Sequence, residues 1–177
     1  MMTAYHSSAR GDGDGRDDWQ TPRELFDAIA ERHRLCFVLD AACETHNALC
    51  ERAAAHDEGV DGLSLDWSEV GPTWVNPPYS EVRRWMQKAR REGRRVPVAC
   101  LVPCRPSTRW WAESVHSPHG LTCAAFVDML HGRVTFRGAS SGAPFPSAVV
   151  VYLPGWSGPP VVRVWDWRSR QLLLPVT

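Results

Sequence analysis

The stretch TWVNPPYSEVRRW, residues 73–85, constrains the fold more than any other part of this 177-residue chain. TWV is a short apolar run typical of a buried strand, and Ser80 precedes a segment typical of a capped helix that runs to about Glu92. Pro77 and Pro78 lie between them. Neither can belong to a central strand, because proline lacks the backbone N–H and fixes φ. We therefore predict a strand, a stiff turn and a helix in succession.

A helix start precedes this stretch. In WQTPRELFDAIAERH, Thr21 is suited to the N-cap, Pro22 to the first helical position and Glu24 to closing a capping box. The apolar run LCFVLD at 35–40 then predicts a central strand of a parallel sheet, ending in Asp40.

The rest of the chain continues this alternation and then changes character. Residues 47–55 predict a second helix. Residues 95–103 predict a buried strand with Pro97 at its entry or on a bulge, and residues 107–115 predict a further helix. Three β-rich runs follow, at 121–127, 132–136 and 147–153. This order predicts an α/β fold with a mainly parallel sheet finished by a C-terminal antiparallel hairpin.

The length suits one globular domain. Residues 1–17 are rich in Gly and Asp and lack the apolar core of a signal peptide, so we expect a disordered leader. We expect the folded domain at 18–153 and a Trp-rich tail at 154–177. No apolar run is long enough to span a bilayer, which favours a cytoplasmic protein without a membrane partner.

Charge is balanced at 20 basic and 20 acidic residues, so the total does not indicate a polyanionic partner. The distribution is uneven, because residues 81–95 hold seven Lys or Arg against two Glu. This stretch is either a solvated helix face or a surface for nucleic-acid phosphates.

Six cysteines occur without a CxxC pair, and no export signal precedes them, so reduced thiols are expected. Five possible ligands lie close together in the sequence, namely Cys36, Cys43, His46, Cys50 and His56. Their spacing matches no compact zinc finger or ribbon, so we expect no metal site.

The residues of NPPY suit chemistry on an exocyclic amino group. Ligands of open α/β sheets gather at the carboxyl ends of the strands, where Asn76 would lie. Its side-chain carbonyl and the backbone carbonyl of Pro77 are two acceptors, which can hold both N–H groups of an amine and stabilise the positive charge of the attacking nitrogen. Tyr79 adds a flat surface on which a planar ring can stack. The alternative is a rigid turn with a half-buried tyrosine.

A series of motifs occurs in order between residues 17 and 153: DDWQTPRELFDAI, VLDAACETHNALC, DGLSLDW, WVNPPYSEVRRWMQKA, LVPCRPSTRWWAE, GRVTF and PFPSAVVVYL. Together they resemble the small phage-type DNA N6-adenine methyltransferases. The resemblance implies a Rossmann-like, class I S-adenosylmethionine-dependent methyltransferase fold at 18–153. It also implies methyl transfer from S-adenosylmethionine to N6 of a flipped-out adenine in double-stranded DNA, in the bacterial host cytoplasm if a phage encodes the protein.

The resemblance also assigns the catalytic residues. Asn76, Pro77, Pro78 and Tyr79 match the catalytic motif of amino methyltransferases.

For the cofactor, Thr21 and Pro22 match the segment before the first helix that helps to enclose it. Asp40 matches the acidic residue that closes the first strand, near the methionine moiety, and Ala41 follows it. Asp66 resembles the acidic residue that accepts from the cofactor's adenine amino group.

The sequence departs from the usual methyltransferase pattern in one respect. The first strand of methyltransferases is usually followed by a glycine loop, but DAACETHN contains no glycine. Neither GxGxxG nor a Walker A pattern occurs elsewhere. Asp57, Glu58 and Asp61 are all candidates for the residue that binds the cofactor ribose.

Arg83 and Arg84 are the candidates for DNA phosphate contacts, because they lie in the first turn after NPPY, where a flipped adenine brings the backbone. Target specificity would come from the loop at 131–147 or from a partner subunit. The residues define neither the target sequence nor the oligomeric state.

Other interpretations stay open. NPPY also occurs in enzymes that methylate glutamine in proteins or guanine in RNA, whereas a cytosine N4 methyltransferase usually begins the motif with Ser. A non-catalytic DNA-binding module would use residues 81–95 alone.

Overall fold

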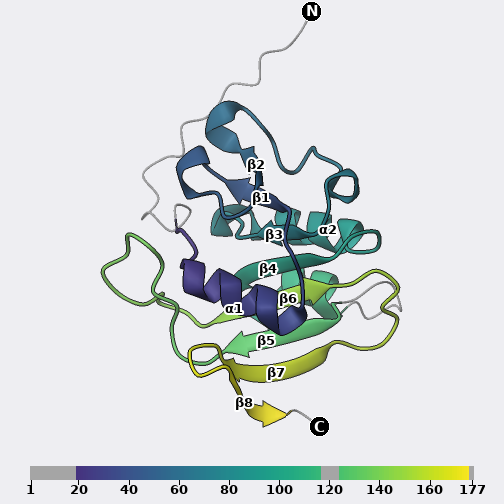
Figure 1. Cartoon of the computed structure of the whole chain (residues 1–177). Helices are drawn as coiled ribbons and strands as arrows, with labels where there is room; N and C mark the ends of the chain where they lie inside the picture. The colour runs from purple at the N-terminus through teal and green to yellow at the C-terminus, as the bar shows by residue number, and fades with distance from the viewer. Residues whose placement is uncertain (1–18, 117–123, 176–177) are drawn as a thin grey trace, which may run out of the picture.

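The computed structural model describes residues 19–116 and 124–175. At its centre lies an eight-stranded sheet with the strand order β2-β1-β3-β4-β6-β5-β7-β8 (Figure 1). The strands are β1 (Leu39–Cys43), β2 (Arg52–Ala55), β3 (Thr73–Val75), β4 (Val98–Pro103), β5 (Phe126–Leu130), β6 (Ser147–Tyr152), β7 (Val161–Asp166) and β8 (Gln171–Pro175). The helices are α1 (Arg23–His33), α2 (Val82–Glu92), α3 (Arg109–Trp111) and the π-helix η6 (Ala112–His116), with 3-10 helices η2 (Thr45–Asn47), η3 (His56–Glu58), η4 (Trp67–Glu69) and η5 (Tyr79–Glu81).

The sheet is mixed, and most of its strand pairs are parallel. β2, β1, β3 and β4 run parallel, and β5 runs parallel to β7. β6 is antiparallel to both β4 and β5, and β8 is antiparallel to β7. The predicted α/β sheet is confirmed, and it is consistent with a Rossmann-like fold. The antiparallel part is larger than predicted, because β6 lies between β4 and β5 and a second antiparallel pair ends the sheet.

Helices α1 and α2 cover opposite faces of the sheet. Side chains alternate along a strand, and in β4 Val98, Cys100 and Val102 pack in the core that contains α2, whereas Ala99 and Leu101 pack in the core that contains α1. Every residue of β4 is buried, as expected for a strand covered on both faces. α1 crosses the front of the sheet in Figure 1. Burial of each Val or Leu side chain contributes about 1.5–3 kcal/mol.

The helix predicted at 47–55 was wrong. Arg52–Ala55 form β2, which pairs in parallel with β1. Parallel strands usually need a crossover of about a dozen residues or more, but residues 44–51 are enough here. Ala54 and Ala55 are buried in this strand, so pairing along the free edge of β1 outweighs the helix propensity of alanine.

The first strand begins later than predicted. Residues 35–38 are irregular and β1 begins at Leu39, so Asp40 is its second residue and not its last. The N–H groups of Val38 and Leu39 both donate to the carbonyl of Pro72, and ladder pairing with β3 starts there. Asp40 therefore lies beside Trp74 of β3.

The predicted capping box of the first helix does not form. Pro22 occupies the N-cap of α1, and no side chain caps that end, so Thr21 and Glu24 do not bond as predicted. A backbone bridge between Gln20 and Arg137 pairs the preceding segment with a distant one. This pairing holds the chain extended up to the first turn of α1.

The helix after NPPY also starts later than predicted. Ser80 lies within η5, and α2 begins at Val82 with Glu81 at an N-cap position that no side chain caps. The strand predicted at 95–103 is confirmed as β4, with Pro97 directly before its first residue. The helix predicted at 107–115 is present as α3 followed by η6.

The last third of the chain differs most from the prediction. β6 confirms the strand at 147–153, but β5 begins only at Phe126, and residues 121–123 lie outside the described residues. Residues 132–136 form no strand. Residues 161–175, expected within a tail, form β7 and β8 and extend the sheet. The expected leader at 1–17 lies outside the described residues.

Among the described residues, no helix combines the length and the apolar character that are needed to cross a bilayer.

A buried ion cluster joins α1, β5 and β7. The side chain of Asp128 is fully buried, and its carboxylate accepts from Arg32 Nε at 2.7 Å and from Arg163 Nε at 2.6 Å. His33 Nε2 lies 3.0 Å from the same carboxylate. Burial raises the pKa of Asp128, but the contact with His33 and the hydrogen bonds from Arg32 and Arg163 outweigh it and lower the pKa from 3.8 to about 2. The cluster therefore favours the charged carboxylate.

We expect Asp128→Asn to lower the free energy of unfolding by about 3–5 kcal/mol at neutral pH, because it leaves buried cations without a partner. The pKa of Asp128 is lower in the folded state than in the unfolded state, so its charge contributes about 2 kcal/mol to the free energy of unfolding. This contribution is fully present above about pH 4 and is lost as the pH falls towards about 2. Urea denaturation at neutral pH and at about pH 3 measures both effects. Asp27→Asn is the control, because Asp27 pairs with Arg23 on an exposed helix face, where such pairs contribute at most about 1 kcal/mol. Equal losses in the two variants would contradict the prediction.

Candidate active site

Asn76 directly follows β3, at the carboxyl edge of the parallel strands. Its side-chain Nδ2 donates to the backbone carbonyl of Trp19 at 2.6 Å. A carbonyl can only accept, so the amide nitrogen must point at Trp19 and the amide oxygen must point away from it. Asn76 Oδ1 is buried and has no hydrogen-bond partner in the described part of the chain. The site therefore contains one oriented acceptor that the protein itself leaves unsatisfied.

Tyr79 stands in a cluster of aromatic rings, which we call the aromatic cluster: Trp19, Tyr79, Phe136 and Phe145. The Tyr79 ring centroid lies 5.9 Å from that of Trp19, 6.4 Å from Phe136 and 5.6 Å from Phe145. Trp19 stacks on Phe136 at 4.9 Å. The hydroxyl of Tyr79 is buried without a partner among the described residues, and burial raises the pKa of Tyr79.

The aromatic cluster is the part of the site that sequence reasoning missed. Pro77 and Pro78 lie between β3 and η5, where the stiff turn was predicted, and both are buried. Trp19, Phe136 and Phe145 come from two other segments, and only their closeness to TPRE, GRVTF and PFPS in the sequence could have indicated them. The loop expected to carry specificity, 131–147, supplies both phenylalanines.

Thr21 lies two residues after Trp19, before α1. Its hydroxyl is buried and has no hydrogen-bond partner among the described residues. The carbonyl of Pro22 accepts from the N–H groups of Leu25 and Phe26 and starts the helix. Thr21 Oγ1 is thus a third buried polar atom of the site without a hydrogen-bond partner among the described residues, and it lies in the segment that contacts Asn76.

Asp40 and Ala41 lie in β1, next to β3. The Asp40 carboxylate accepts from the backbone N–H of Leu49 at 3.0 Å and of Ala42 at 3.5 Å. Burial raises the pKa of Asp40 to about 6, against the lowering effect of these two bonds. Asp40 is therefore a buried carboxyl without a cationic partner among the described residues, at the edge where Asn76 lies.

Gly62 brings the segment after β2 against β1. A Cβ at this position would overlap the backbone carbonyl of Ala41 and come within 3.1 Å of the Trp85 ring. Asp61, directly before it, accepts from Leu63 N at 2.9 Å and from the Ser64 hydroxyl at 2.7 Å. Asp61 therefore directly precedes the residue that contacts β1, while its carboxylate bonds within its own turn.

The other two candidates for a ribose contact lie in η3. Asp57 accepts from the backbone N–H and the hydroxyl of Thr45, which lower its pKa. Glu58 is exposed.

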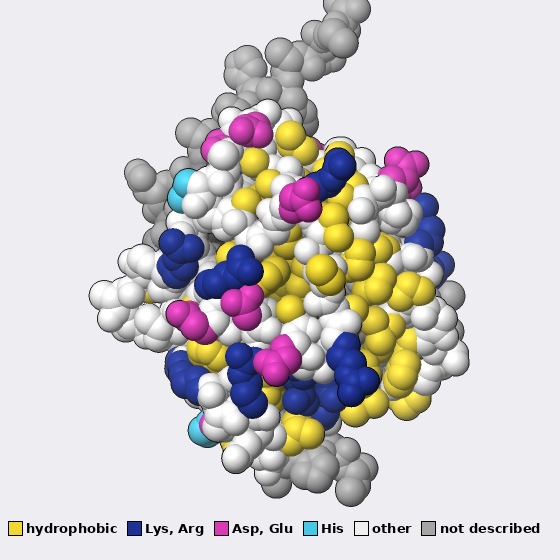
Figure 2. All heavy atoms as spheres, viewed as in Figure 1, with side chains coloured by type: hydrophobic (Ala, Val, Ile, Leu, Met, Phe, Trp, Pro, Cys, Tyr) yellow, Lys and Arg dark blue, Asp and Glu magenta, His cyan; other side chains and the backbone are white. Residues whose placement is uncertain are grey.

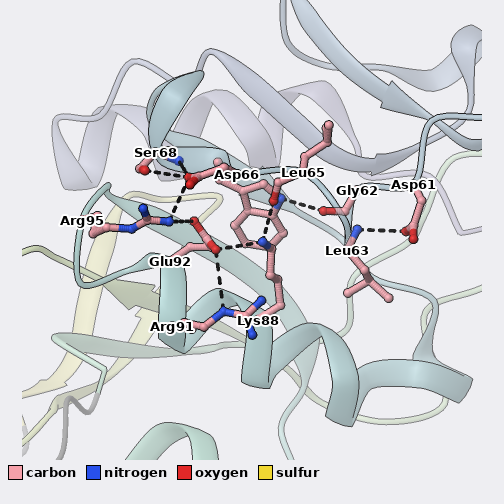
Figure 3. Close-up of polar contacts among 11 residues, drawn as sticks. Asp61, Gly62, Leu63, Leu65, Asp66, Ser68, Lys88, Arg91, Glu92 and Arg95 are labelled. Carbon is pink, nitrogen blue, oxygen red and sulfur yellow. Dashed lines mark hydrogen bonds and ion pairs between the residues drawn. The ribbon is translucent and has the colours of Figure 1, made fainter.

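Asp66 contacts Ser68 and Arg95 (Figure 3). Its carboxylate accepts from the Ser68 hydroxyl at 2.6 Å and from Arg95 at 2.8 Å, and these contacts lower the pKa of Asp66 to about 2. Arg95 follows α2 and precedes β4, which places this pair at the amino edge of the parallel strands. The structure does not bring Asp66 together with Asn76, so its role in cofactor binding stays a prediction that this arrangement does not favour.

The basic stretch 81–95 is largely paired with acidic groups. Arg83 contacts Glu113 at 3.2 Å, and Arg84 contacts Glu81 at 2.7 Å. Lys88 is buried, pairs with Glu92 at 2.8 Å and donates to the carbonyl of Leu65. Basic and acidic side chains also stand side by side on the face that carries α1 (Figure 2).

Within residues 19–116 and 124–175, no three His, Cys, Asp or Glu side chains are grouped so that they could hold a metal ion. The cysteines in these ranges are free thiols.

An NPPY turn at the carboxyl edge of a mostly parallel sheet is the arrangement expected of an amino-group methyltransferase. Comparison with known families agrees: the model of the DNA N-6-adenine-methyltransferase (Dam) family matches residues 9–151, and the chain belongs to this family. A DNA N-6-adenine-methyltransferase of Escherichia phage T1 is 31% identical over 100 residues, which cover 56% of this chain and 41% of that protein. The match thus spans less than half the length of this relative.

We expect Gly62→Ala to lower the free energy of unfolding by about 1–3 kcal/mol, because the added methyl group must push the 61–63 segment away from β1. Gly158→Ala is the matched control, since its Cβ would meet the Trp156 ring at an ordinary 3.6 Å. Urea denaturation of both variants is the measurement. Equal stability in the two would show that Ala41 and Gly62 are not in close contact.

Proposed function

We propose that this protein transfers a methyl group from S-adenosylmethionine to N6 of adenine in double-stranded DNA, within a class I methyltransferase fold. The observation that carries the proposal is the amide of Asn76. Its nitrogen is anchored on the Trp19 carbonyl and its buried oxygen is left without a partner, inside the NPPY turn of a chain that belongs to the Dam family.

Asn76 Oδ1 and the backbone carbonyl of Pro77 would accept the two hydrogens of the adenine amino group. Both acceptors stabilise the positive charge that develops on N6 as it attacks, and they direct its lone pair away from the ring plane. S-adenosylmethionine, when bound, supplies the electrophilic methyl group. The bond to sulfur breaks as N6 bonds the methyl carbon, and the electron pair stays with the sulfur of the departing thioether. N6 then loses one hydrogen as a proton to water, and until then Asn76 Oδ1 accepts a hydrogen bond from the amine.

The aromatic cluster would receive the adenine ring. Stacking of a base on an aromatic side chain is worth about 1–3 kcal/mol. Three rings already surround Tyr79, so an incoming base must replace one of these contacts. Phe145 is the best suited to move, because Phe136 is almost fully buried and Trp19 is tied to Asn76 by its backbone.

The residues present fit the cofactor. Thr21 and Pro22 follow closely after Trp19, whose carbonyl accepts from Asn76, and the open hydroxyl of Thr21 can bond a polar ligand. Asp40 offers a buried carboxyl for a cationic group, next to Ala41. We infer that Asp61 is better placed than Asp66 for a cofactor contact, because its neighbour Gly62 lies against Ala41 of β1 while Asp66 is paired with the cation of Arg95.

Methylation of protein glutamine, RNA guanine or cytosine N4 would use the same acceptors. Family membership favours adenine in DNA, and such a substrate would place the reaction in the cytoplasm of a bacterial cell. Transfer from labelled cofactor to unmethylated DNA, followed by nucleoside analysis, tests the assignment. Label in any product other than N6-methyladenine would overturn it.

We expect Asn76→Ala to lower the rate of methyl transfer roughly a hundredfold or more, since loss of one aimed acceptor costs on the order of 3 kcal/mol at the transition state. Cofactor affinity, measured by calorimetry, should change little because Asn76 contacts the amine. Asn47→Ala is the matched control: Asn47 Oδ1 accepts from Glu44 N in η2, and its loss should leave the rate nearly unchanged. A folded Asn76→Ala protein that keeps half the wild-type rate would refute the role.

We expect Asp61→Ala to weaken S-adenosylmethionine binding more than Asp66→Ala does. Each variant removes one carboxylate that accepts from a serine hydroxyl, so the two are chemically matched and differ in which edge of the sheet they occupy. Calorimetric titration with the cofactor measures the difference. A larger loss in Asp66→Ala would instead support the assignment made from the sequence.

A further inference from the structure

We propose that Arg105 and Arg137 form the surface that binds the DNA backbone on either side of the extruded adenine. This inference rests on the proposed function and assigns the phosphate contacts to two arginines outside α2. Three observations carry it: the pairing of the α2 cations, the place of the two arginines beside the aromatic cluster, and the absence of acidic partners for both among the described residues.

The first turn of α2 is a weaker phosphate surface than its sequence indicated. Arg84 bonds Glu81, and Arg83 shares Glu113 with Arg109, whose Nε lies 2.6 Å from that carboxylate. A phosphate arriving here would compete with carboxylates that already neutralise the cations. Exposed pairs are individually weak, at about 0–1 kcal/mol, but they reduce the local positive potential that attracts DNA.

Arg105 lies two residues after the end of β4, at the same edge as Asn76. Its guanidinium stands over the ring of Phe145, 5.1 Å from the centroid, and Phe145 contacts Tyr79. The side chain is exposed, and no ion pair or hydrogen bond of its side chain occurs among the described residues. A guanidinium held flat on a ring keeps its N–H edge free, and that edge matches the two oxygens of a phosphate.

Arg137 approaches the aromatic cluster from a different segment. Its backbone N–H donates to the carbonyl of Gln20 at 2.9 Å, and its neighbour Phe136 stacks on Trp19. The Arg137 side chain is exposed and, within the part of the chain that the structure describes, has no carboxylate partner. Backbone pairing therefore fixes the position of this residue while its charge stays available.

A flipped base turns out of the duplex about its own backbone, so the flanking phosphates must pass close to the pocket that receives the base. Arg105 contacts Phe145 of the aromatic cluster, and Arg137 directly follows Phe136 of the same cluster. Each phosphate that a cation neutralises releases counterions and adds about 0.9 to the slope of log affinity against log salt. Phosphate contacts by both arginines would therefore contribute about 1.8 to the slope of log affinity against log salt.

The test is the affinity of the full-length chain for an unmethylated duplex oligonucleotide across a salt series, measured by fluorescence anisotropy. Arg105→Ala/Arg137→Ala should lower the slope by about 1.8, so that between about 50 and about 200 mM salt the wild-type affinity falls roughly tenfold more than that of the variant. Arg105→Lys/Arg137→Lys should restore most of the slope, because it restores the charges.

Two double variants with the same change in net charge are the controls. Arg52→Ala/Arg94→Ala removes exposed cations from the amino ends of β2 and β4, and Arg83→Ala/Arg84→Ala removes the paired cations of α2. Both should change the slope by much less than 1. An equal change in all three double variants, or the largest change in Arg83→Ala/Arg84→Ala, would overturn the proposal.

The same proteins separate this inference from the proposed function. If DNA binding depends on salt and needs Arg105 and Arg137 but no N6-methyladenine forms, the proposed methyltransferase activity is contradicted and the proposed DNA-binding surface is supported. If the variant that lacks both arginines still methylates DNA and its salt slope is unchanged, the methyltransferase activity is supported and the DNA-binding surface is contradicted. Cofactor binding by calorimetry confirms that each variant is folded.

Discussion

The hydrogen bond between Asn76 Nδ2 and the Trp19 carbonyl joins residues 57 positions apart and organises the site around it. The prolines after Asn76 remove the N–H groups that could have continued the strand, so the turn has to be held by contacts from outside the sheet. The segment before α1 provides them: Trp19 contacts Asn76 through its backbone and Phe136 through its ring, and Gln20 pairs with Arg137. Three distant parts of the chain thus share one set of contacts, and the orientation of the Asn76 amide depends on all three.

The sequence predicted those features that local chemistry determines. Proline at 77 and 78 ended β3, and the apolar run before Pro103 formed β4, because each pattern needs only its own neighbours. β2 was missed because alanine-rich residues 52–55 have helix propensity, and only the free edge of β1 makes them a strand. Likewise, Asp61 and Asp66 look equivalent in DGLSLDW, and only the ion pair with Arg95 places the second one at the other edge of the sheet.

The missing glycine after β1 has a physical counterpart in the fold. A methyltransferase needs close approach of the backbone to its cofactor, and glycine usually allows it. In this chain the residues after Asp40 are alanines, but Gly62 allows a second segment to come against the Ala41 carbonyl. This close approach joins two backbone segments of the chain. No pattern in the sequence of either segment reveals this, because the contact joins residues that are 21 positions apart.

The two tasks of the site, receiving a base and holding the backbone, meet at Phe145. The ring contacts Tyr79 on one side and the guanidinium of Arg105 on another, and a cation–π contact of this exposed kind is worth about 0.5–1 kcal/mol. Phe145 therefore joins the part of the site that would receive the base to the part that would hold the backbone. A balanced net charge is compatible with such a surface, because carboxylates neutralise Arg83 and Arg84, while Arg105 and Arg137 have no acidic partner among the described residues.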